Sequence, residues 1–154
     1  SNNYFPSALS DYILDRYFDA QVIDWSRLYL DSYLASIEEN KKKEAELINN
    51  RVNGTKPSLK LDQYTGLYGA EMYGNAEVVL KNNQLIINFL PTPIYSGILT
   101  HWHYDIFRIK LTDTPSLPEG TVQFIMEPDG KIVEMKVDIP NPDFDFTELK
   151  FKRK

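Results

Sequence analysis

The sequence of 154 residues contains no cysteine and only two histidines. The missing cysteines exclude disulfide bonds, thiolate catalysis and zinc sites built on thiolates. The two histidines, His101 and His103, are the whole imidazole content of the chain. A metal site built on them would therefore need carboxylates as its remaining ligands.

A broad basic surface and a long apolar run are also missing from the sequence. The formal net charge is −5, and the short basic stretches at residues 41–43 and 150–154 are too small for the positive surface that phosphate binding needs. No apolar run approaches the roughly 20 residues of a membrane span. Because 42% of the residues are hydrophobic and 13% aromatic, the chain can bury a core. We expect a folded protein with no nucleic-acid partner and no membrane insertion.

Residues 4–51 are predicted to be helical because apolar residues recur every three or four positions. Pro6 suits the first turn of one helix, and the Asp24 carboxylate can cap the start of a second. One face of the first helix holds Leu9, Tyr12, Ile13, Tyr17 and Phe18. The apolar stripe of the second holds Trp25, Leu28, Tyr29, Tyr33, Leu34 and Ile37. Asn53-Gly54 then marks the end of the helical region.

From Leu59 onward the hydrophobic pattern changes to a period of two, which indicates strands. One hairpin is predicted around Asn82-Asn83 and another around residues 128–130, where the sequence is Pro-Asp-Gly. The stretches SGILTHW and DIFRIKL predict a third. About eight short strands without crossover helices favour an antiparallel barrel or sandwich. We therefore predict a mainly β fold preceded by two α-helices, with a helical connector at residues 1–56 and a barrel domain at residues 57–154.

The stretch LTHWHYDIFRI, residues 99–109, concentrates both histidines beside Trp102, Tyr104 and Asp105. On a continuous strand His101 and His103 would share one face, and Asp105 extends the pattern to H-x-H-x-D. Such a pattern can hold a metal and is similar to the metallo-beta-lactamase signature, but no further histidine exists to complete that signature. The alternative is that Asp105 turns a hairpin while the histidines bond to backbone or to a neighbouring surface. We expect no metal and no cofactor.

Motifs of serine hydrolases are missing as well. The chain has neither G-x-S-x-G nor S-x-x-K, so nothing marks a catalytic nucleophile. The Y-x-N match at Tyr73 is too short to indicate a site without that nucleophile. We therefore expect no catalytic residue in this chain.

Aromatic residues in the second part of the chain suggest a different kind of site. Aromatic walls with a few polar tips are typical of small-molecule pockets. The candidate ligand-binding residues are His101, Trp102, His103, Tyr104, Tyr64 and Tyr68. The alternative is that most of these aromatics fill the interior, as in most small barrels.

Four stretches of the chain resemble a known bacterial domain. They are PSLKLDQYTGLY, YGNAEVVLKNNQLIINF, LTHWHYDIFRI and IPNPDFDFTELKF, and together they run from about Pro57 to Phe151. They look like the C-terminal domain of unknown function that follows the catalytic domain in many bacterial serine hydrolases of the beta-lactamase type. The stretch before them, from Asp24 to Ser58, looks like the helical connector that precedes that domain.

The resemblance implies a lipocalin-like β-barrel and places the catalytic serine and lysine in an upstream domain. It offers no catalytic residue to carry over onto this chain, which we expect to be a C-terminal portion of a larger hydrolase. It also implies that the upstream catalytic domain is the main partner. A homodimer is expected as a further partner because the first 25 residues carry a high apolar load. The expected location is the periplasm or another extracytoplasmic site of a bacterium, with the cytoplasm as the alternative.

Three functions follow from these observations. The leading one is a non-catalytic accessory domain that packs on the catalytic domain and shapes access to the active site or assembly. The second is a small-molecule-binding barrel with a pocket near residues 101–104. The third is a metal-dependent enzyme that uses His101, His103 and Asp105.

Overall fold

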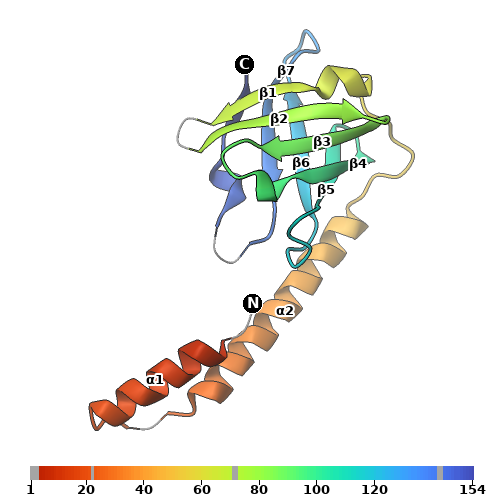
Figure 1. The fold of residues 1–154 in the computed structure, drawn as a ribbon. Coiled ribbons are helices and arrows are strands. Elements are labelled where there is room, and N and C mark those ends of the chain that lie inside the picture. The colour runs from red at the N-terminus through yellow and green to blue at the C-terminus, as the bar shows by residue number, and fades with distance from the viewer. Residues whose placement is uncertain (1–3, 22, 71–72, 142–143) are drawn as a thin grey trace. The chain divides into compact units, whose positions relative to one another are not determined.

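The computed structural model describes residues 4–21, 23–70, 73–141 and 144–154, and it shows two helices followed by eight strands (Figure 1). The chain divides into two compact units, one up to residue 50 and one from residue 51 onward. No helix within the described residues is long and apolar enough to cross a membrane. Pro142 and Asp143, which belong to the family-like stretch PDFDF, lie outside the described residues.

The first unit is a hairpin of two helices, α1 (Phe5–Tyr17) and α2 (Trp25–Asn49). Pro6 stands in the first turn of α1 as predicted. The Asp24 side chain caps α2 by accepting a hydrogen bond from the Arg27 amide at 3.0 Å, which confirms the predicted helix start. The break between the helices is therefore encoded by this cap.

The two helices meet through polar tips of aromatic residues. The Trp25 indole donates to the Asp15 carboxylate at 2.6 Å, and the Tyr29 hydroxyl donates to Asp11 at 2.7 Å. The hydrogen bond to Asp11 raises the pKa of Tyr29. Asp11 and Asp15 lie one turn apart, so both carboxylates point along the same face of α1. The interface therefore uses this face and leaves the apolar face of α1 exposed.

The second unit, shown in Figure 1, is a closed antiparallel barrel. Its last strand, β8, pairs with β1. The strands are β1 (Gly66–Ala70), β2 (Gly74–Lys81), β3 (Gln84–Phe89), β4 (Gly97–His103), β5 (Ile106–Leu111), β6 (Gly120–Met126), β7 (Ile132–Asp138) and β8 (Phe151–Arg153). Each strand pairs with its neighbours in the sequence, and closure removes the free edges that an open sheet would leave. The predicted fold class, two helices followed by an eight-stranded antiparallel barrel, is confirmed.

The turn residues form the predicted hairpins. Asn82 and Asn83 join β2 to β3 with φ angles of 50° and 61°, which asparagine tolerates better than most residues. Gly130 has a φ of 81° in the turn between β6 and β7. The third predicted hairpin joins β4 to β5, with Tyr104 at a φ of 47°. The strand order of the barrel therefore follows from local turn chemistry.

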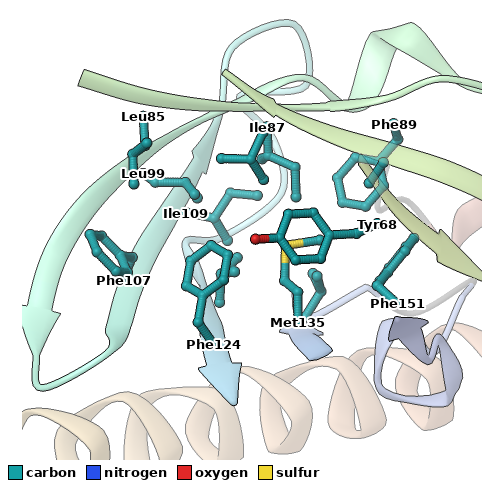
Figure 2. Packing of buried hydrophobic residues seen from close by; sticks show 14 of the residues in the cluster. Tyr68, Leu85, Ile87, Phe89, Leu99, Phe107, Ile109, Phe124, Met135 and Phe151 are labelled. Atoms are coloured by element: carbon teal, nitrogen blue, oxygen red, sulfur yellow. The ribbon is translucent and has the colours of Figure 1, made fainter. Parts of the chain in front are cut away.

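The barrel interior is filled by side chains. Figure 2 shows Tyr68, Phe107, Phe124 and Met135 converging with the aliphatic side chains of β3, β4 and β5. The rings of Phe107 and Phe124 pack edge to face with centroids 5.7 Å apart. This geometry is favourable for aromatic pairs beyond the burial of their area. Packed aromatics therefore form the centre of the domain.

The chain closes the barrel with a short 3-10 helix, η3 (Phe146–Glu148), before β8. Phe146, Leu149 and Phe151 are all buried, although their spacing does not follow the period of two. Three residues per turn of a 3-10 helix bring Phe146 and Leu149 to the same side. This turn explains why the spacing of Phe146, Leu149 and Phe151 departs from the period of two.

Ile87 provides a test of the filled interior, because its side chain is fully buried on β3. We expect Ile87→Ala to lower the free energy of unfolding by about 2–5 kcal/mol through lost burial and a residual cavity. Urea denaturation measures this change. Ile94→Ala, at an exposed position, serves as the control and should change stability by less than about 0.5 kcal/mol. Similar small losses in both variants would contradict a packed interior.

Candidate functional site

The residues of the H-x-H-x-D pattern do not lie on one continuous strand. Between His101 and His103 the register of β4 against β5 shifts, so that His101 pairs with Phe107 and His103 pairs with Ile106. Directly paired residues share a face, and neighbouring residues on a strand point to opposite faces. The shift therefore separates the two histidines, and the expectation that they share a face is wrong. The bulge at this position causes the difference.

Each of the three polar side chains of the pattern has its own partner. His101 lies beside Phe107, with ring centroids 5.6 Å apart, and its Nε2 donates to the Tyr104 carbonyl at 2.9 Å. His103 and Asp105 bond to residues before the barrel. No group of three metal-ligating side chains occurs within the described residues. The geometry agrees with the structural alternative, in which the histidines bond to backbone and Asp105 lies in the hairpin turn.

The HWHYD stretch (residues 101–105) binds the segment that leads into the barrel, which we call the entry segment (residues 51–59). The Arg51 side chain donates to the Trp102 carbonyl at 3.1 Å. The Val52 amide donates to Nδ1 of His103 at 3.0 Å. These bonds join residues 51 positions apart in the sequence. The beginning of the entry segment is thereby attached to the end of β4.

Two further attachments follow along the entry segment. The Tyr104 amide donates to the Thr55 hydroxyl at 3.0 Å. The Asp105 carboxylate accepts from the Ser58 amide at 3.0 Å and from the Ser58 hydroxyl at 2.7 Å. Four successive residues of the HWHYD stretch, from Trp102 onward, therefore contact the entry segment. The two stretches run in the same direction and form a polar clamp at one end of the barrel.

Asp105 connects this clamp to the barrel core through Tyr64. The Tyr64 hydroxyl donates to Asp105 and accepts from the Leu59 amide at 3.2 Å. The Tyr64 ring is 0% exposed and packs against Phe124 with centroids 4.9 Å apart. Burial, and the hydrogen bond to Asp105, raise the pKa of Tyr64 well above its usual range. The phenol therefore stays protonated and keeps donating at physiological pH.

Trp102 covers the outer surface of the barrel beside two arginines. The Arg51 guanidinium lies 4.2 Å from the centre of the Trp102 ring, and that of Arg108 lies 5.5 Å from it. Arg108 is only 9% exposed and lies 3.5 Å from the Glu119 carboxylate. Its neighbours in sequence, Phe107 and Ile109, belong to the core, so Arg108 itself points outward. Trp102 therefore belongs to the clamp through cation–π contacts and lies outside the packed interior.

The six predicted ligand-binding residues fall into two groups. His101, Trp102, His103 and Tyr104 lie in the HWHYD stretch, whereas Tyr64 and Tyr68 are buried inside the barrel. The Tyr68 hydroxyl donates to the Tyr64 carbonyl at 2.8 Å, which links Tyr68 to the clamp through Tyr64. Burial raises the pKa of Tyr68 to about 12, although the charge of Arg153 acts in the opposite direction. Ligand binding by these six residues stays a prediction.

The residues that sequence reasoning missed are those of the entry segment. Arg51, Val52, Thr55 and Ser58 stand in a stretch with the composition of a linker. Their partners are 47 to 51 positions away, beyond the reach of any local pattern. The signal in the sequence was the concentration of polar and aromatic side chains in HWHYD. Such side chains need hydrogen-bond partners, but the pattern does not show where these partners lie.

Asp105 offers the clearest test of the clamp. Asp105→Ala removes the acceptor of the Ser58 amide, the Ser58 hydroxyl and the Tyr64 hydroxyl. Because donors left without a partner in a partly buried site are costly, we expect the free energy of unfolding to fall by about 1–3 kcal/mol in urea denaturation. Asp113→Ala, at an exposed position, is the matched control. If both variants unfold at the same urea concentration, the clamp has no role in stability.

Comparison with known proteins identifies the family to which the chain belongs. Residues 50–153 match the family described as a domain of unknown function, DUF3471. The crystal structure of the C-terminal domain of penicillin binding protein Rv0907 has the same fold, with a TM-score of 0.50 and 24% sequence identity over 66% of this chain and 91% of that chain. No curated protein matches the chain. The family resemblance of the four quoted stretches is confirmed, and the chain belongs to the DUF3471 family.

Proposed function

We propose that this chain is a non-catalytic accessory part of a beta-lactamase-type serine hydrolase. The observation that carries the proposal is the match of residues 50–153 to DUF3471. The shared fold with the C-terminal domain of a penicillin binding protein supports it. In this proposal residues 1–56 connect the barrel domain, residues 57–154, to an upstream domain that holds the catalytic serine and lysine.

The use of the polar side chains supports an accessory role. Both carboxylate oxygens of Asp105 accept hydrogen bonds, and the Ser58 hydroxyl is bound to one of them. The His103 ring accepts from the Val52 amide at the nitrogen that a general base would need. These groups are engaged in holding the entry segment, which supports a structural role for the HWHYD stretch.

The exposed face of α1 is the proposed docking surface for the upstream domain. Phe5, Leu9 and Ile13 are 63%, 45% and 55% exposed and lie on one side of the helix. An open groove of about 350 Å³ between α1 and α2 continues this surface, with Tyr4, Tyr29 and Leu30 among its lining residues. Contiguous apolar surface of this kind marks interaction sites on soluble proteins. Packing there would let the connector shape access to the active site or assembly.

The proposed parent would work outside the cytoplasm of a bacterium, in the periplasm or at the cell surface. The shared fold with the C-terminal domain of a penicillin binding protein supports this location. Localisation of the longer polypeptide by a compartment-specific reporter fusion tests it, and cytoplasmic accumulation would contradict it.

The first experiment asks where catalysis takes place. The isolated chain should not turn over chromogenic β-lactam or ester substrates above the rate of the heat-unfolded sample. In the longer polypeptide, a fluorescent β-lactam should acylate a serine outside the 154 residues, as mapped by mass spectrometry of the peptides. Ser58→Ala is the matched variant within this chain, because Ser58 is the hydroxyl bound to Asp105. Labelling of a serine within the 154 residues, or turnover that Ser58→Ala abolishes, would contradict the proposal.

The second experiment tests the docking surface on α1. Without its partner domain, the apolar face should be covered by a second copy, since symmetric dimers are the commonest outcome for such surfaces. We expect light scattering to show concentration-dependent dimers, and monomers for Ile13→Glu or after removal of residues 1–23. Ser10→Glu adds the same charge at another exposed position of α1 and should still dimerise. A parent that stays monomeric, with α1 fully protected in hydrogen exchange, would show that the docking assignment is wrong.

A further inference from the structure

The two histidines of the HWHYD stretch use their rings in opposite ways. Nδ1 of His103 accepts a hydrogen bond from the Val52 amide at 3.0 Å, so this nitrogen carries a lone pair and the ring proton is on Nε2. Nε2 of His101 lies 2.9 Å from the Tyr104 carbonyl oxygen. Because a carbonyl oxygen only accepts, this nitrogen donates. One histidine is therefore an acceptor and the other a donor.

Protonation affects these two hydrogen bonds differently. An imidazolium ring carries a proton on both nitrogens and has no acceptor left. His101 can gain a proton on Nδ1 and still donate to Tyr104 through Nε2. A proton on Nδ1 of His103 would instead point at the amide proton of Val52. The bond between His103 and the entry segment therefore exists only while the His103 ring is neutral.

Charged groups on several neighbouring elements surround the HWHYD stretch. Arg51 lies next to Val52 in the entry segment and binds the Trp102 carbonyl, and on β5 Arg108 lies near the same Trp102 ring. Of the acidic groups on the neighbouring elements, Asp105 is bound by Ser58 and Tyr64. Glu119 lies beside Arg108. On β4, the His101 ring is bound to the Tyr104 carbonyl. The HWHYD stretch therefore contacts two guanidinium groups as well as the entry segment.

We propose that His103 makes attachment of the first part of the entry segment dependent on pH. The neutral ring holds Val52, and the protonated ring releases it as the pH falls through the range in which imidazoles titrate, about pH 8 to 5. The Ser58 end of the segment stays attached, because Asp105 and not a histidine holds it. Acidification therefore breaks the attachment at Val52, whereas Arg51, Thr55 and Ser58 keep hydrogen bonds that involve no histidine.

Amide hydrogen exchange of Val52, followed by NMR and expressed as a protection factor, tests this device. Loss of one hydrogen bond should reduce the protection of Val52 by about tenfold between pH 7.5 and pH 5. The Ser58 amide, bound to Asp105, serves as the internal control and should keep its protection. Equal protection of Val52 at both pH values in the parent protein would overturn the proposal.

Two variants separate His103 from other groups that titrate. His103→Asn keeps an acceptor oxygen near the position of Nδ1 but does not titrate, so Val52 should remain protected at pH 5. His101→Gln keeps a donor nitrogen near the position of Nε2 and should lose Val52 protection on acidification as the parent does. In the parent, the Val52 amide shift should also follow the titration of the His103 ring and not that of His101. A loss of protection that persists in His103→Asn, or that follows His101, would show that another group is responsible.

Discussion

The carboxylate of Asp105 connects the apolar core of the barrel to the polar entry segment. On one side it accepts from the hydroxyl of Tyr64, whose ring packs against Phe107 and Phe124 in the core. On the other side it binds the amide and hydroxyl of Ser58 in the entry segment. The Asp105 carbonyl also accepts from the Phe124 amide at 3.0 Å. Side chain and backbone of a single turn residue thus fix the entry segment, the β4–β5 hairpin and β6 to one another.

This arrangement gives the barrel a fixed point of attachment and an interior filled by side chains. Large aromatic side chains occupy the interior (Figure 2). The polar and aromatic residues of the HWHYD stretch lie at one end and bind the chain that enters the barrel. A domain that holds its own connector firmly is suited to keep a neighbouring domain in place. That property supports the proposed accessory role.

Local chemistry made the strand order predictable. The asparagine pair between β2 and β3 and the glycine between β6 and β7 adopt positive φ angles, which few other residues favour. The cap at Asp24 likewise marked the start of α2. Each of these features depends on residues close in sequence, so the pattern of the chain contains the necessary information.

The site was less predictable, because it depends on distant partners and on a local irregularity. A period of two placed His101 and His103 on one face, and the bulge between them does not follow from any turn residue. The partners of His103 and Asp105 lie about 50 positions earlier, in a stretch that has the composition of a linker. Similarly, the helix pattern identified the apolar face of α1 but not that α2 would pack on Asp11 and Asp15 instead. The hydrogen bonds from Trp25 and Tyr29 on α2 to these carboxylates explain that choice.

A double-mutant cycle between Tyr64 and Asp105 measures the central interaction most directly. Tyr64→Phe, Asp105→Ala and the double variant would be compared with the parent by urea denaturation. The phenol and the carboxylate are expected to stabilise each other. The losses of unfolding free energy in the two single variants should then add up to about 0.5–3 kcal/mol more than the loss in the double variant. Additive losses would contradict the account, because the core and the entry segment would then be held independently of each other.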